Sequence, residues 1–64
     1  MSYIKHITKY YPGSETTATI LTDADGMYRV TVVHRFDSGI FIREPNHNNL
    51  SLTAAEGLLA YYTA

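Results

Sequence analysis

The sequence predicts an α+β fold: a three- to four-stranded antiparallel meander sheet with one C-terminal helix packed on one face, in a single small domain over residues 1–64. Three observations predict it. Residues 27–36 alternate between apolar and polar side chains with the two-residue period of a half-buried strand. Two short segments ending in glycine, 24–26 and 37–39, are typical of hairpin loops. The last apolar stretch, 54–62, has a helical period.

The first strand is predicted over residues 2–11, which are rich in Tyr, Ile and Thr. The pattern does not resolve which of its faces is buried, because Ile7 shares one side with Lys5 and Lys9 and the other side is equally mixed. A Pro-Gly-Ser sequence at 12–14 supplies turn geometry and ends the strand.

The second strand is predicted over residues 16–22. The Ala-Asp-Gly sequence at 24–26 suits a three-residue loop that ends in a left-handed glycine. This loop sets Ile20 opposite Val30, so Ile20 and Ala18 join the buried face. A shift of one residue would bury the opposite set of side chains.

The third strand, 27–36, is expected to direct one row of apolar side chains toward the helix: Tyr28, Val30, Val32 and Phe36. The loop at 37–39 sets His34 opposite Ile42 and predicts a short fourth strand over 40–44. Proline lacks a backbone donor, so Pro45 is expected to end this strand at a sheet edge and to begin a polar connection over 45–49.

The helix is predicted over residues 54–62. Thr53 and Glu56 match a capping box, in which the threonine accepts from the backbone and the glutamate reaches back. The stripe expected to cover the sheet consists of Ala55, Leu58, Leu59 and Tyr62. A helix this short is marginal alone, so packing must hold it.

Composition restricts the compartment and the partners. The chain has no cysteine and a net charge of −1. We therefore expect no disulfide and no thiolate zinc site, as in a reducing compartment, and predict a cytoplasmic protein. The N-terminal residues have no apolar signal region, and no run approaches the ~20 apolar residues of a membrane helix, so no membrane partner is expected. The net charge counts against strong phosphate-driven binding of nucleic acid.

No set of residues predicts a metal ion, a cofactor or catalysis. His6, His34 and His47 are far apart and lack a metal-ligand spacing. His34 is instead expected to be a hydrogen-bonded residue at the margin of the buried face. There is no cysteine nucleophile, no nucleophile elbow and no glycine-rich phosphate loop, so the prediction is a protein that is not an enzyme.

The sheet face opposite the helix is the predicted partner-binding surface, because nothing else in the chain can cover it. All five basic residues lie in predicted strands, whereas five of the six acids, Glu15 among them, lie at turns or at the helix start. Mixed arginine and apolar side chains are typical of contact surfaces. The residues assigned to this face are Thr17, Thr19, Leu21, Arg29, Thr31, Val33, Arg35, Phe41 and Arg43. Lys5, Lys9 and Ile7 are left open as further members.

Two other interpretations of this face stay open. Its cationic side chains could keep an exposed sheet hydrated and block edge-to-edge pairing, with no partner involved. Its apolar members could instead be buried if the register is shifted by one residue.

The favoured hypothesis is a small protein–protein interaction module or inhibitor that acts through this face on a foreign partner or on a second copy, as a homodimer. The alternative is nucleic-acid binding through the same face. Three strands followed by a helix is similar in outline to the small DNA-binding arms of phage and transposon integrases, which read the major groove with the sheet. Small single domains without catalytic motifs are also similar to phage and plasmid accessory proteins, some of which block a host defence enzyme.

Overall fold

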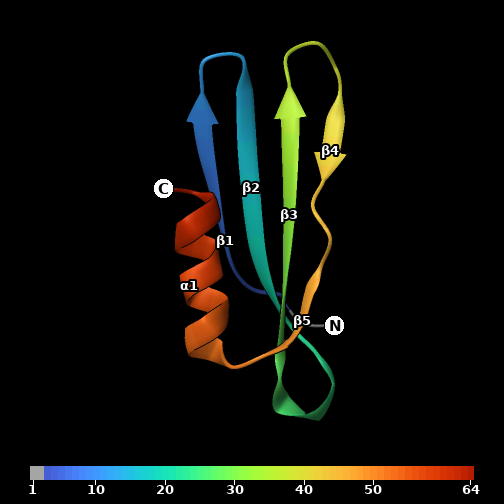
Figure 1. Cartoon of the computed structure of the whole chain (residues 1–64), viewed down its shortest axis with the longest axis vertical. Coiled ribbons are helices and arrows are strands. Elements are labelled where there is room, and N and C mark those ends of the chain that lie inside the picture. The colour runs from blue at the N-terminus through green and yellow to red at the C-terminus, as the bar shows by residue number, and fades with distance from the viewer. Residues whose placement is uncertain (1–2) are drawn as a thin grey trace.

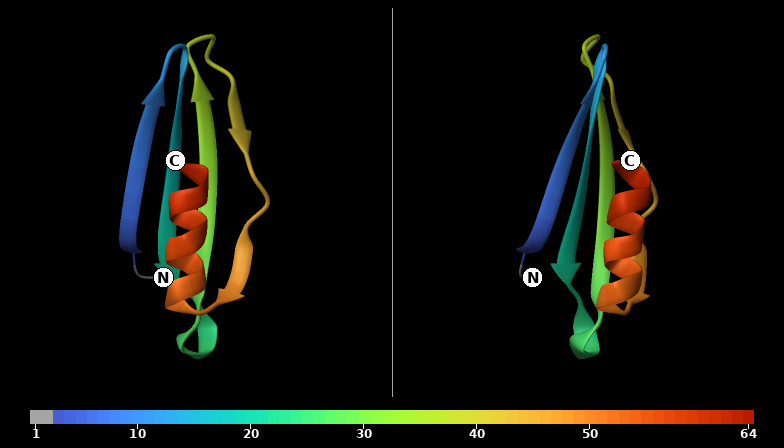
Figure 2. Two further views of the ribbon diagram at one scale, coloured as in Figure 1. Left: turned by 60° about the vertical axis from the view of Figure 1, so that its left-hand side comes forward. Right: turned by 90° about the vertical axis from the view of Figure 1, so that its left-hand side faces the viewer.

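The computed structural model describes residues 3–64 and confirms the predicted α+β architecture, with an antiparallel sheet and one C-terminal helix. Ser2, where the predicted first strand begins, lies outside the described residues. Strands β1 to β4 lie in chain order across the sheet, and β5 pairs with β3 (Figure 1). Their bounds are β1 Tyr3–Tyr11, β2 Ser14–Thr22, β3 Tyr28–Phe36, β4 Phe41–Arg43 and β5 His47–Leu50. The helix α1, Leu52–Tyr62, lies on one side of the sheet (Figure 2).

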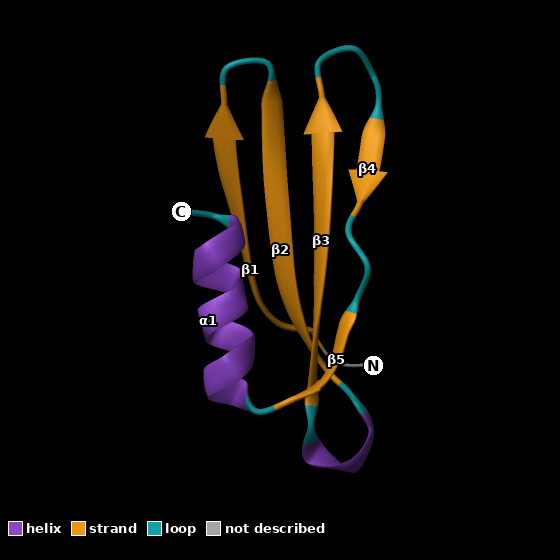
Figure 3. Ribbon diagram, viewed as in Figure 1, coloured by secondary structure: helices purple, strands orange, loops and turns teal. Residues whose placement is uncertain are grey.

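The β2–β3 hairpin has the register that the sequence predicts. Ile20 pairs with Val30 and Ala18 pairs with Val32. The loop between them contains one turn of 3-10 helix at Ala24–Gly26 (Figure 3). Asp25 and Gly26 both have left-handed φ angles, of 60° and 71°. Aspartate tolerates that conformation better than most residues, so the loop has two left-handed positions where the sequence predicts one.

The chain after Pro45 returns to the sheet, so the expectation of a polar connection over 45–49 is wrong. Residues His47–Leu50 form β5, which pairs antiparallel with β3 and sets Leu50 opposite Tyr28. Asn49 has a φ of 61°, and the register shifts beside it, as in a β-bulge. An edge chain needs hydrogen bonds on one side only, so a single proline interrupts its pairing locally rather than ending it.

The helix begins earlier than predicted, and its N-cap is Ser51 rather than Thr53. The Ser51 Oγ accepts a hydrogen bond from the backbone N–H of Ala54 at 3.2 Å. Thr53 is exposed inside the first turn. The predicted capping box with Glu56 is therefore wrong, and the cap is a serine with no carboxylate three residues later.

The core lies between the helix and the two central strands. Its fully buried residues come from β2, β3 and α1 in equal measure: Ala18, Ile20, Val30, Val32, Ala55 and Leu59. Tyr28, Leu58 and Tyr62 pack against it while staying partly exposed. Phe36, which the sequence predicts in the row of side chains beneath the helix, is 36% exposed instead. It lies at the end of β3 nearest the 37–39 loop, and the helix does not extend over it.

The structure settles the orientation of β1. Ile7 lies opposite Ala18 and packs against the core, while Lys5 and Lys9 lie opposite Ile20 and Thr16. Directly opposed residues point to the same side of a sheet, so Lys5, Ile7 and Lys9 all lie on the helix side. None of them joins the surface proposed as partner-binding.

Across residues 3–64, the structure contains no helix that is both long enough and apolar enough to cross a membrane.

Candidate functional site on the open face of the sheet

The sheet face opposite the helix, hereafter the open face, is covered by none of the elements that the structure describes (Figure 2). Pairing across β2, β3 and β4 fixes its members. Thr17 lies opposite Val33, and Val33 lies opposite Arg43. Alternation along each strand places the nine residues predicted for this surface on the open face, and all nine are partly or fully exposed.

Two rows of side chains cross the open face at the end of the sheet that carries the 12–13 and 37–40 connections. We call this the turn end. The two connections touch there, because the Asp37 backbone N–H donates to the Gly13 carbonyl at 3.1 Å. The row nearest the connections consists of Tyr10, Glu15, Arg35 and Phe41, and the next consists of Thr8, Thr17, Val33 and Arg43.

The first row is held together by side-chain contacts. Arg35 Nη1 lies 3.4 Å from Glu15 Oε1. The Arg35 guanidinium carbon also lies 4.9 Å from the centre of the Phe41 ring, within the range of a cation–π contact. Arg35 therefore connects an acid on β2 to an aromatic ring on β4. In the second row, the Thr8 and Thr17 hydroxyls are hydrogen-bonded at 3.0 Å.

The members of these two rows on β2, β3 and β4 line a shallow depression of about 430 Å³, which we call the turn-end depression. Its apolar side chains are Val33 and Phe41, and Phe41 is 61% exposed. Its lining residues are Glu15, Thr17, Val33, Arg35, Phe41 and Arg43. A second depression, of about 310 Å³, adjoins it on the side of Tyr10 and Phe36. Glu15 and Arg35 line both depressions.

The remaining predicted residues lie further along the open face, toward the 24–26 loop. Thr19 is opposite Thr31, and Leu21 is opposite Arg29. Arg29 is tied to Asp23, with 3.3 Å between Nη2 and Oδ1. The structure therefore gathers five of the nine predicted residues around one depression and leaves these four outside it.

Sequence reasoning missed Glu15 as a member of the site. The sequence predicts that the second strand begins at Thr16, which leaves Glu15 in the preceding turn. The strand begins at Ser14, so Glu15 lies inside it and faces the same way as Thr17. The signal was present in the sequence, since the alternation of open-face residues in β2 continues back to Glu15.

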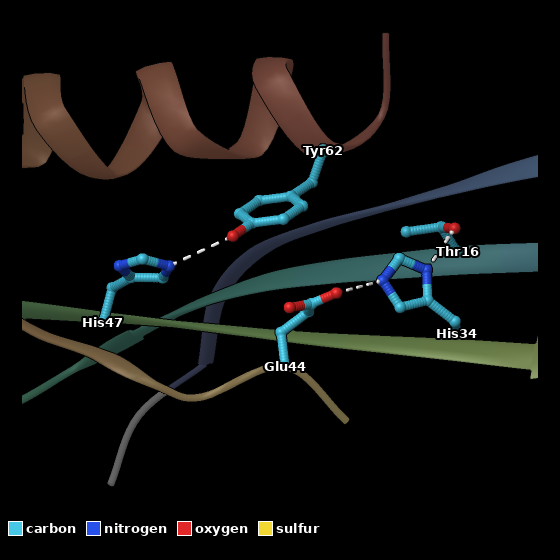
Figure 4. Close-up of polar contacts among 5 residues, drawn as sticks. All are labelled: Thr16, His34, Glu44, His47 and Tyr62. Atoms are coloured by element: carbon cyan, nitrogen blue, oxygen red, sulfur yellow. Dashed lines mark hydrogen bonds and ion pairs between the residues drawn. The ribbon is translucent and has the colours of Figure 1, made fainter. Parts of the chain in front are cut away.

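A polar cluster lies on the other side of the sheet, at the margin of the core (Figure 4). His34 Nδ1 is 2.8 Å from Thr16 Oγ1, and His34 Nε2 is 2.9 Å from Glu44 Oε2. Separately, His47 Nε2 is 3.2 Å from the Tyr62 hydroxyl. His34 is thus the hydrogen-bonded margin residue that the sequence predicts.

Thr16, His34 and Glu44 form a hydroxyl–imidazole–carboxylate chain of hydrogen bonds, in the same order as in a catalytic triad. Thr16 is only 5% exposed, so its hydroxyl lies in the core margin and cannot reach a substrate. The contacts instead satisfy a buried hydroxyl next to the helix. Among the described residues, no three histidine, aspartate or glutamate side chains are grouped so that they could hold a metal ion.

Comparison with protein-family models, curated proteins and solved structures finds no match to this chain. Its function is therefore inferred from the geometry of the site.

Proposed function

We propose that this chain is a small protein-interaction module, without enzymatic activity, that binds a protein partner through the turn-end half of the open face. The observation that carries the proposal is the turn-end depression, in which an exposed phenylalanine is fixed beside two arginines. Such a module could act as an inhibitor by covering a functional surface of its partner.

Three of the six residues that line the depression, Arg35, Phe41 and Arg43, are of types enriched at protein interfaces, whereas Glu15 is not. Aromatic residues and arginine are enriched at protein interfaces, whereas lysine and glutamate are depleted. Phe41 is 61% exposed, so a partner that covers its ring would gain the free energy of burying that apolar surface. Its contact with Arg35 restricts the ring before binding, and this reduces the entropy that binding would cost.

The charges favour a protein partner over a nucleic acid. Two of the three open-face arginines already contact acids, because Arg29 lies beside Asp23 and Arg35 lies beside Glu15. A surface that binds phosphates would instead offer several cations free to replace counterions. The carboxylates would also lie close to the nucleic-acid backbone and repel it.

The test is capture of partners from extracts of cells that make the protein, with the wild type and two variants as bait. Phe41→Lys places a charge in the depression. Ile42→Lys is the matched control, because Ile42 is the next residue of β4, is 49% exposed and lies on the helix side opposite His34. Circular dichroism checks that both variants are folded.

We expect Phe41→Lys to abolish capture and Ile42→Lys to preserve it. Losing a central aromatic anchor typically costs about 2 kcal/mol or more. That is a loss of roughly 30-fold in affinity. Light scattering at micromolar concentration shows whether the partner is a second copy. Equal capture by wild type and Phe41→Lys would contradict the proposal.

A further inference from the structure

Arg43 is the arginine of the turn-end depression that lacks a charged partner. Within residues 3–64, no hydrogen bond or ion pair joins its side chain to another residue, although its backbone pairs with Val33. Arg35, on the neighbouring strand, is already held by Glu15 and Phe41. The depression therefore presents one uncompensated guanidinium beside an apolar floor.

The arrangement of charge and apolar surface defines what would complement it. Arg43 and Phe41 are two residues apart on β4 and point to the same face, with Val33 opposite Arg43. A guanidinium binds a carboxylate through two parallel hydrogen bonds, which gives the contact a direction as well as strength. The Phe41 ring and the Val33 methyl groups offer an apolar contact immediately beside that point.

We infer that the turn-end depression binds a protein segment that carries an aspartate or glutamate next to an apolar side chain. The carboxylate pairs with Arg43, and the apolar side chain lies on Phe41 and Val33. This inference rests on the proposed function and adds the chemistry of the partner to it. Arg35 is already paired with the Glu15 carboxylate, so Arg43 is the one arginine among the described residues of the depression left to bind a carboxylate of the partner.

The chain supplies a matched control for the charge of Arg43. Arg43→Glu changes the net charge by two units on the open face. Lys9→Glu makes the same change on the helix side, where Lys9 is exposed and lies opposite Thr16. Arg43→Lys keeps the charge but removes the bidentate geometry.

The experiment is selection from a phage-displayed library of random twelve-residue peptides, with the immobilised wild-type protein as target. Selected peptides are then synthesised and their dissociation constants are measured for the wild type and the three variants. We expect enrichment of aspartate or glutamate next to aromatic or aliphatic residues. Arg43→Glu should weaken these peptides by at least about tenfold, Arg43→Lys by less, and Lys9→Glu by no more than about twofold.

Three results would overturn the inference: no enriched peptide, enrichment without an acidic preference, or equal losses in Arg43→Glu and Lys9→Glu. A 20-nucleotide single-stranded DNA that binds the wild type at low salt and is weakened by Arg43→Glu would also overturn it in favour of a nucleic acid. The capture experiment separates this failure from that of the proposed function. Capture that depends on Phe41 but not on Arg43 would support the proposed interaction module and contradict the inference that its partner carries an acidic segment.

Discussion

At the scale of single residues, His34 shows how much of a side chain's environment the sequence pattern can predict. Its position on the inner side of the third strand predicts a hydrogen-bonded residue at the margin of the core. The partners are Thr16, directly opposite on β2, and Glu44, beyond β4. The predicted fourth strand, with Ile42 opposite His34, already places Glu44 on the same face as His34, but alternation alone does not show that the two side chains meet.

The N-cap of the helix is a residue-level error with a clear cause. Thr53 and Glu56 satisfy the capping-box spacing, whereas Ser51 is followed three residues later by an alanine. The helix nevertheless begins at Leu52, so Thr53 lies in its first turn rather than at the N-cap. A short motif tests only local hydrogen bonds, while the position of the helix also depends on packing against the sheet.

Replacing Ser51 with alanine should destabilise the protein. The substitution removes the acceptor for the Ala54 backbone N–H, which is worth about 0.5–2 kcal/mol in folding free energy. Thr53→Ala is the control, since Thr53 is exposed in the first turn and should change stability by no more than about 0.5 kcal/mol. Urea denaturation measures both. A larger loss in Thr53→Ala than in Ser51→Ala would show that the helix begins where the capping box predicts.

At the scale of elements, the strands were predictable because their signals are local. Alternation and glycine-ending loops fix the β2–β3 pairing without reference to the rest of the chain. The sequence does not predict β5, for the complementary reason. Its sequence, His-Asn-Asn-Leu, has low strand propensity, and it forms only because the edge of β3 beside Tyr28 and Val30 is available to it.

The contact between the helix and the sheet depends on Leu59. This side chain is 1% exposed and lies in the core with residues of both central strands. Leu59→Ala should cost about 2–5 kcal/mol, from lost burial and from the cavity left behind. In a domain of this size that is a large fraction of the total stability.

Leu52→Ala is the control for this prediction. It deletes the same atoms from the same helix at a site that is 39% exposed, so the loss should be much smaller. Thermal unfolding followed by far-ultraviolet circular dichroism compares the two. Equal losses at the two positions would contradict the helix orientation described above.

At the scale of the whole molecule, the helix is too short to cover the sheet. The molecule measures 39 Å along its longest axis. A helix of eleven residues is about 16 Å long. The helix side of the turn end therefore keeps Phe36 and Ile42 exposed, while Tyr10 and Phe41 are exposed on the open face, which no described element covers.

This geometry explains which part of the candidate site the sequence could predict. Alternation alone assigns Arg35, Phe41 and Arg43 to the face away from the helix. It does not place the depression at the turn end, because that depends on contacts across three strands, such as Glu15 with Arg35 and Arg35 with Phe41. Lys5 and Lys9 illustrate the same limit, since only pairing with β2 shows which way β1 faces.

The most direct test of the central claim, that the partner lies on the open face at the turn end, is photocrosslinking in the cells that make the protein. Benzoylphenylalanine replaces Phe41 in one experiment and Ile42 in the other, and crosslinked products are detected as bands of higher mass. The two positions are adjacent in β4 but lie on opposite faces of the sheet. We expect a discrete partner adduct from position 41 and little or none from position 42. Adducts of equal or greater yield from position 42, or none from position 41, would contradict the account.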